Sequence, residues 1–115
     1  MVSITDTTRS EANLQGGWLG VLRLAFDDVD PITFPGANPE LTPFSSAQAE
    51  DIARFVLAQE TSCKRIFVHC RHGISRSAAV AKAIAGALGA AFPESYAEYN
   101  RHVYSLVTEA MTSGT

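Results

Sequence analysis

The alternation of apolar and polar positions predicts two β-strands in the first quarter of the chain. Val2–Thr5 alternates apolar and hydroxyl side chains, which favours a short strand. The segment Trp18–Phe26 reads as a second strand, in which Leu22, Leu24 and Phe26 share one face. An apolar face of this kind indicates that the strand packs against a core on one side.

Helical spacing of apolar residues begins at Ser45. Ser45 and Gln48 have the spacing of a capping box. The apolar residues that follow repeat at helical intervals up to about Glu60: Ala49, Ile52, Phe55 and Val56. The short apolar run Arg65–His69 then predicts a third strand, of the kind that is buried in the middle of a parallel sheet.

Two further helices are predicted after the third strand. Ala78–Leu88 is alanine-rich, and Gly89 is suited to end this helix. Pro93 suits the first turn of a last helix, whose apolar stripe would comprise Tyr96, Tyr99, Val103, Leu106, Val107 and Ala110. This order of elements predicts an α/β fold: a single domain over residues 1–115, with a mostly parallel central sheet flanked by helices.

Composition and charge limit the classes of function. The chain has 115 residues, of which 46% are hydrophobic, and a formal net charge of −3. Nine basic residues against twelve acidic ones argue against a general nucleic-acid binder or a polybasic membrane surface. Lys82 interrupts the longest alanine-rich stretch, so no apolar run reaches the ~18 residues of a membrane span. Because Met1–Asp6 also lacks the features of a signal peptide, we expect a protein of the reducing cytoplasm.

The two cysteines predict neither a disulfide nor a zinc site. Cys63 and Cys70 stand seven positions apart, which is about 23 Å along a strand at ~3.3 Å per residue and too far for a disulfide. The sequence contains neither Cys-x-x-Cys nor a Cys/His cluster with zinc spacing. The sequence therefore predicts no structural zinc site, and we expect no cofactor.

The segment V-H-C-R-H-G-I-S-R-S, residues 68–77, joins the third predicted strand to a helix, and ligand sites in open α/β sheets lie at such strand ends. The backbone N–H groups from Arg71 to Arg76 can curl inward around an anion, and Gly73 supplies the backbone freedom that a tight cradle needs. The helix N-terminus adds partial positive charge, and the Arg76 guanidinium matches two phosphate oxygens. The segment thus predicts a phosphate-binding loop, whose other members are His72, Ile74 and Ser75.

Cys70 would lie at the bottom of this loop as a nucleophile. The dipoles that attract phosphate also stabilise a thiolate, and cysteines in such positions have pKa values from ~3.5 to ~7.5. A thiolate below a phosphorus atom is placed for in-line attack. Ser77 could donate a hydrogen bond to the sulfur and ease its departure, and His69 is expected to hold the loop through hydrogen bonds.

The sequence His69-Cys70-Arg71-His72-Gly73-Ile74-Ser75-Arg76-Ser77 resembles the signature H-C-x-x-G-x-x-R-S of cysteine-dependent protein tyrosine phosphatases. It is most similar to the dual-specificity branch and its small bacterial and phage relatives. The resemblance implies a minimal dual-specificity-phosphatase-like fold, a cysteinyl-phosphate intermediate and no metal. It also implies an aspartic acid on a separate loop as general acid and then base.

Three aspartates follow the second predicted strand: Asp27, Asp28 and Asp30. Members of the family place the acid after a strand, in a pattern like apolar-x-apolar-x-apolar-x-Asp, and the spacing up to Phe26 favours Asp28. Asp27 would point to the other face, but the absence of a Trp-Pro-Asp sequence leaves all three as alternatives. The prolines after these aspartates exclude regular structure and would make the segment the mobile acid loop: Pro31, Pro35, Pro39 and Pro43.

Tyr99–Asn100 resembles the Pro-Asn with which the family begins its last helix, and there the asparagine supports the phosphate loop. Asn100 as a simple helix cap is an equal alternative. The 24 positions from Arg76 to Asn100 are fewer than dual-specificity enzymes usually have, as if one helix were missing. Arg71 and His72 would stand at the pocket rim, or on a merely solvated face.

These features favour a metal-independent phosphatase for phosphotyrosine-type esters, with phosphoserine or phosphothreonine as further substrates. Its partners would be phosphorylated proteins or small phosphomonoesters, including nucleotides, inositides and phosphorylated RNA 5′ ends, and no membrane. A rhodanese-like sulfurtransferase or an arsenate reductase would use a similar loop, but His69 and Ser77 disfavour both. A non-catalytic phosphoprotein-binding module is a third hypothesis, although such modules usually lose the cysteine or the arginine.

Overall fold

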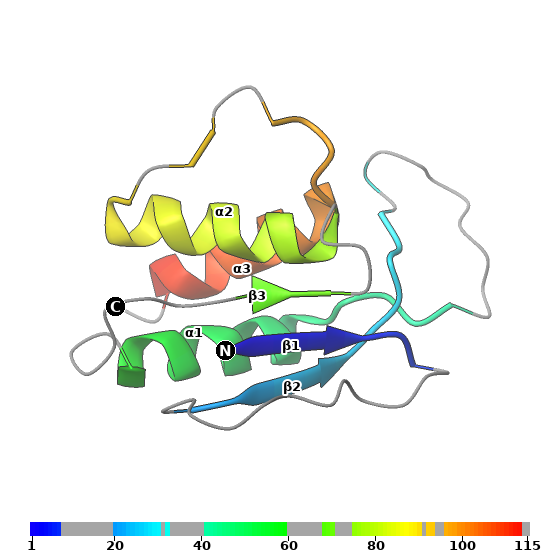
Figure 1. The fold of residues 1–115 in the computed structure, drawn as a ribbon, viewed down its shortest axis with the longest axis horizontal. Helices are drawn as coiled ribbons and strands as arrows, with labels where there is room; N and C mark the ends of the chain where they lie inside the picture. The colour runs from blue at the N-terminus through cyan, green and yellow to red at the C-terminus, as the bar shows by residue number, and fades with distance from the viewer. Residues whose placement is uncertain are drawn as a thin grey trace.

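The computed structural model describes residues 1–7, 20–30, 32, 41–59, 68–70, 75–90, 92–93 and 96–113. In this part of the chain three strands form one parallel sheet in the order β2–β1–β3. They are β1 (Val2–Thr5), β2 (Leu22–Ala25) and β3 (Val68–His69). Val2 pairs with Leu22 on one side and with Val68 on the other. The first strand of the chain is therefore the central one, and the three strands end at the same edge of the sheet (Figure 1).

The predicted strand Val2–Thr5 is confirmed. Of the predicted strand Trp18–Phe26, Trp18 and Leu19 lie outside the described residues, and Gly20, Val21 and Phe26 lie outside β2. β2 spans only Leu22–Ala25 because β1 offers partners only from Val2 to Thr5. The predicted face of β2 is correct, since Leu24 and Phe26 are buried whereas Arg23 and Ala25 are exposed. Of the predicted third strand, Arg65–Phe67 lies outside the described residues, as does Cys63.

Helix α1 (Ser46–Gln59) begins at the predicted capping box. The backbone N–H of Gln48 donates to Ser45 Oγ at 3.2 Å, and the backbone N–H of Ser45 donates to Gln48 Oε1 at 3.1 Å. Gln48 Nε2 also donates to the carbonyl of Ala25 at 3.0 Å. The capping residue therefore ties the start of α1 to the end of β2.

Helix α2 (Arg76–Leu88) ends at Gly89, which adopts the left-handed conformation with φ 72°, as predicted. Helix α3 (Arg101–Ser113) begins eight residues later than the predicted start at Pro93. That prediction was wrong because Asn100 caps the helix instead: its Oδ1 accepts the backbone N–H of Val103 at 3.1 Å. Pro93 lies outside the helix, and its carbonyl accepts the Tyr96 N–H at 3.2 Å.

All three helices share one hydrophobic core with the sheet. Val2, Ile4 and Leu24 supply the sheet side of this core, and each helix contributes buried side chains to it: Ala49, Ile52, Ala53 and Val56 from α1, Ala79, Val80, Ala83 and Ile84 from α2, and Val103, Val107 and Met111 from α3. In Figure 1, α3 passes between α1 and α2. The predicted α/β class with a parallel sheet is confirmed. None of the described helices is long and apolar enough to cross a membrane.

Candidate active site

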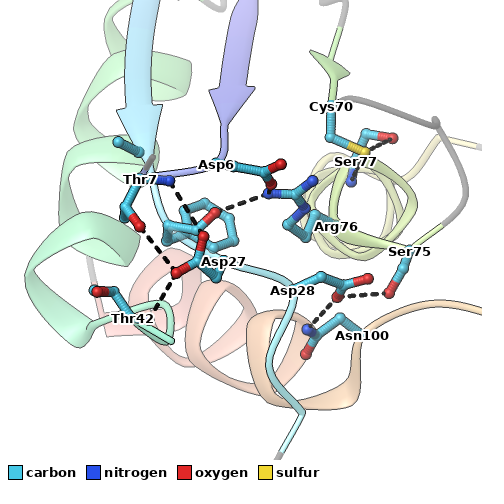
Figure 2. A network of polar contacts seen from close by, with 12 residues as sticks. Asp6, Thr7, Asp27, Asp28, Thr42, Cys70, Ser75, Arg76, Ser77 and Asn100 are labelled. Carbon is cyan, nitrogen blue, oxygen red and sulfur yellow. Dashed lines mark hydrogen bonds and ion pairs between the residues drawn. The ribbon is translucent and has the colours of Figure 1, made fainter. Parts of the chain in front are cut away.

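The site lies where the carboxyl ends of the strands meet the N-termini of α2 and α3 (Figures 1 and 2). Asp6 follows β1, Asp27 and Asp28 follow β2 after one residue, and Cys70 follows β3 directly. Parallel strands place their carboxyl ends at one edge of the sheet. Residues from distant parts of the chain therefore meet around the first turn of α2.

Cys70 is a reduced cysteine of which only 9% is exposed. Its sulfur accepts a hydrogen bond from the backbone N–H of Ser77 at 3.4 Å and lies 3.3 Å from Ser77 Oγ. Ser77 is the second residue of α2, so the sulfur faces the first turn of that helix. A backbone donor and a helix N-terminus both favour negative charge on the sulfur.

Arg76 is 4% exposed, and both of its polar contacts in the described part of the chain use Nη1. This atom donates to the carbonyl oxygen of Phe26 at 2.8 Å. It also forms an ion pair with Asp6 Oδ1 at 2.7 Å. With Nη1 held in this way, the edge formed by Nε and Nη2 is left to receive two oxygens of an anion.

Asp6 is a site residue that the sequence analysis missed. It lies directly after β1, which is the central strand, and its side chain is 20% exposed. A signal was present, because an acidic residue directly after a parallel strand lies at the edge where sites form. The alternation in Val2–Thr5 predicts the strand but assigns no role to the residue that follows it.

Asp28 is exposed, and its Oδ1 accepts two hydrogen bonds. Ser75 Oγ donates at 3.0 Å and Asn100 Nδ2 at 2.8 Å. Asn100 is 1% exposed, and its Nδ2 also donates to the carbonyl of Val29 at 2.9 Å. Its backbone N–H donates to the carbonyl of Ser75 at 3.1 Å. Asn100 therefore both caps α3 and joins the segment of Asp28 to the residue that precedes Arg76.

Asp27 points away from these groups, toward Thr7 and Thr42 (Figure 2). Its Oδ2 accepts the Thr42 N–H at 2.8 Å and the Thr7 hydroxyl at 2.9 Å, and Oδ1 accepts the Thr7 N–H at 3.2 Å. The Thr42 N–H is the main cause that holds the pKa of Asp27 below its usual value. The Thr7 groups and the charge of Arg76 act in the same direction, against the opposing effect of burial. Asp27 is thus a buried, ionised side chain that joins the segment after β2 to Thr7 and Thr42.

The remaining predicted site residues are either outside the described part of the chain or make contacts away from Cys70 and Arg76. Arg71, His72, Gly73 and Ile74 lie outside the described residues. The Asp30 carboxylate accepts the backbone N–H of Arg101 at 2.8 Å and of Ile32 at 3.1 Å, so its hydrogen bonds are with the backbone of neighbouring segments. His69 pairs with Ser3 in the sheet, and its Nε2 is buried without a hydrogen-bond partner among the described residues.

The site therefore brings together the Cys70 sulfur at a helix N-terminus, the Arg76 guanidinium held at Nη1, and the exposed carboxylate of Asp28. Such a set can attack an electrophilic centre, hold an anionic group and exchange a proton. Searches of protein-family models, of curated proteins and of solved structures return no match to this chain.

Proposed function

We propose that this protein is a metal-independent phosphomonoester hydrolase of the protein tyrosine phosphatase type, which acts through a cysteinyl-phosphate intermediate. The observation that carries the proposal is the placement of Cys70, whose sulfur accepts the Ser77 N–H at the N-terminus of α2. The loop sequence from Cys70 to Arg76 resembles that of the cysteine-dependent phosphatases. The strand–loop–helix arrangement of β3 and α2 suits a minimal dual-specificity-like fold.

In the first step, the Cys70 thiolate attacks the phosphorus atom and the bond from phosphorus to the ester oxygen breaks. The Nε–Nη2 edge of Arg76 binds two non-bridging oxygens, while Asp6 and the Phe26 carbonyl hold the guanidinium in place at Nη1. The backbone N–H groups of residues 71–76 would bind the phosphate oxygens, with Arg71 and His72 at the rim.

Asp28 supplies the proton that the leaving oxygen needs. Its Oδ1 is occupied by Ser75 and Asn100, which leaves Oδ2 to carry and deliver the proton. In the second step the ionised carboxylate takes a proton from water as that water attacks phosphorus. The sulfur–phosphorus bond then breaks, and the hydroxyl of Ser77 donates to the departing thiolate. Inorganic phosphate leaves and the thiolate is restored.

Phosphotyrosine-type esters are the proposed substrates, with phosphoserine, phosphothreonine and small phosphomonoesters as further candidates. The mechanism uses no cofactor, and the reducing cytoplasm would keep Cys70 as a thiol. Asp28 is preferred over Asp27 because three donors hold both carboxylate oxygens of Asp27 and turn it toward Thr7 and Thr42.

The test is a panel of phosphopeptides and small phosphomonoesters, assayed with EDTA present throughout, on the wild type and Cys70→Ser. We expect the wild type to release phosphate and Cys70→Ser to lose turnover while it still binds phosphate, because a serine hydroxyl does not ionise near neutral pH. Rapid denaturation at alkaline pH during turnover, where the sulfur–phosphorus bond is stable, should trap a phosphoryl group on the peptide that contains Cys70. Turnover by Cys70→Ser would overturn the mechanism. Transfer of sulfur to cyanide, or phosphopeptide binding without turnover, would favour a sulfurtransferase or a binding module.

A further inference from the structure

Three aromatic rings surround the ammonium group of Lys82 in the middle of α2. The Nζ atom lies 5.1 Å from the ring centroid of Tyr99, 5.5 Å from that of Phe92 and 5.6 Å from that of Tyr104. All three distances are within the ≈ 6 Å range of cation–π attraction. We call these four residues the Lys82 box. Its charged member is half-buried, so the rings take over part of the solvation that water would otherwise provide.

The box connects three parts of the chain. Lys82 belongs to α2, Tyr104 to α3, and Phe92 and Tyr99 to the segment between the two helices. The rings of Tyr99 and Tyr104 also pack against each other, with centroids 5.3 Å apart. On Tyr99 the guanidinium of Arg101 makes a second cation–π contact at 4.5 Å. Tyr99 is therefore fixed by two cations and by a neighbouring ring.

Tyr99 immediately precedes Asn100, which reaches into the candidate active site. The Asn100 backbone N–H donates to the Ser75 carbonyl, and its side-chain amide donates to Asp28 Oδ1 and to the Val29 carbonyl. A displacement of Tyr99 would move the Asn100 backbone and lengthen these bonds. The amide that contacts Asp28 therefore belongs to the residue next to a ring that contacts Lys82, about two helical turns along α2.

We propose that Lys82 is a positioning residue for the general acid: the Lys82 box holds Asn100 where its amide fixes the Asp28 carboxylate. The catalytic role that this proposal gives to Lys82 rests on the proposed function. The geometric part does not depend on activity, since it concerns the bond between Asn100 and Asp28. The contacts that Lys82 makes among the described residues are with these three rings and not with Cys70, Arg76 or Asp28.

The first measurement is NMR exchange of the Asn100 side-chain amide protons with water, which needs no substrate. Lys82→Met keeps the apolar stem and removes the charge. We expect it to speed this exchange at least about fivefold, whereas Lys82→Arg should restore slow exchange because a guanidinium also binds aromatic faces. Arg54→Met is the matched control: it also removes one cation from a helix, but Arg54 is 72% exposed and pairs with Asp51 on α1. Unchanged exchange in Lys82→Met, or equally fast exchange in Arg54→Met, would overturn the proposal.

The second measurement compares kcat for phenyl phosphate, a poor leaving group, with kcat for p-nitrophenyl phosphate. In Lys82→Met we expect about a tenfold loss for the first and little loss for the second, because only the first needs the acid. Equal losses on both substrates would show a merely structural role. If Lys82→Met fails to fold in thermal unfolding, Phe92→Leu, which removes one ring, replaces it in both measurements. If the wild type lacks phosphatase activity, the proposed function fails. The exchange measurement still tests whether the Lys82 box holds the Asn100 amide in place.

Discussion

Asn100 and Asp28 are 72 positions apart in the sequence, yet the Asn100 amide donates to Asp28 Oδ1 at 2.8 Å. The same nitrogen donates to the carbonyl of Val29 at 2.9 Å. The first residue before α3 is thereby fixed to the segment that follows β2. This contact gives the exposed carboxylate of Asp28 a defined orientation, which a general acid requires.

Asp28→Asn should lower kcat by ~10²–10⁴ for phosphotyrosine and phenyl phosphate, because an amide cannot deliver the proton to a poor leaving group. The loss should be much smaller for p-nitrophenyl phosphate, whose phenolate departs unaided. The alkaline limb of the pH–rate profile should also flatten. The measurement is kcat against leaving-group pKa for the variant and the wild type.

Asp27→Asn is the internal control for this experiment. Because Asp27 is bound by Thr7 and Thr42, its loss should leave the dependence on the leaving group unchanged. If Asp27→Asn alters that dependence and Asp28→Asn does not, the two roles must be exchanged. If neither variant alters it, Asp30 or a proton from the substrate would have to be considered.

Arg76→Lys should lower the rate by ~10²–10³, since an ammonium cannot make two parallel contacts with a phosphoryl group. Asp6→Asn should lower kcat less, by about tenfold, because it loosens the guanidinium at Nη1 but leaves the Nε–Nη2 edge in place. Steady-state kinetics on one phosphopeptide would measure both. A loss below ~10-fold in Arg76→Lys would mean that this arginine does not bind the transferred group.

Ser77→Ala should slow breakdown of the cysteinyl-phosphate more than its formation. The Ser77 hydroxyl lies 3.3 Å from the Cys70 sulfur and would donate to it as the thiolate departs. Rapid-quench kinetics should show a burst of released phenol followed by slow turnover. Ser45→Ala removes a hydroxyl from the start of α1 instead. It should cost about 1 kcal/mol of stability and produce no burst, and a burst in both variants would contradict this role of Ser77.

Asp27 should make folding stability depend on pH on the acid side. Its pKa in the folded protein lies below the ordinary value of 3.8, so its contribution is complete above that value. The contribution is lost as the pH falls through the folded pKa. Asp27→Asn should therefore be less stable at pH 7, by about 2 kcal/mol for charge-assisted hydrogen bonds. Urea unfolding from pH 7 to pH 2.5 should show the difference from wild type shrinking below about pH 4. A constant difference over this range would contradict the assignment.

The sequence predicts a helix end correctly where residues close to that end in the chain determine it. Ser45 and Gln48 satisfy each other's backbone groups, and Gly89 can adopt a positive φ, so α1 and the end of α2 were predictable. The start of α3 was not predicted correctly, because the three-residue spacing of Tyr96 and Tyr99 imitates a helical stripe. The structure uses Tyr99 in the Lys82 box instead.

Contacts between distant residues could not be read from these patterns. The length of β2 depends on how many partners β1 offers, and the ion pair of Asp6 with Arg76 depends on the strand order. The choice of Asp28 from the alternation of Leu22, Leu24 and Phe26 agrees with its placement beside Ser75 and Asn100. Its role as the acid stays a prediction.

The central place of β1 in the sheet has a consequence for how the protein folds during its synthesis. Val2 must pair with Val68, 66 positions later in the chain, whereas its pairing with Leu22 closes a much shorter loop. At synthesis rates of about 5–20 residues per second, the residues of β3 are added roughly 3–13 s after those of β1. The β1–β2 pair can thus form early, and β3 brings Cys70 to the sheet edge as the last of these strands. Because α2 follows β3 in the chain, the Ser77 N–H can reach the Cys70 sulfur only after the residues of all three strands have been made.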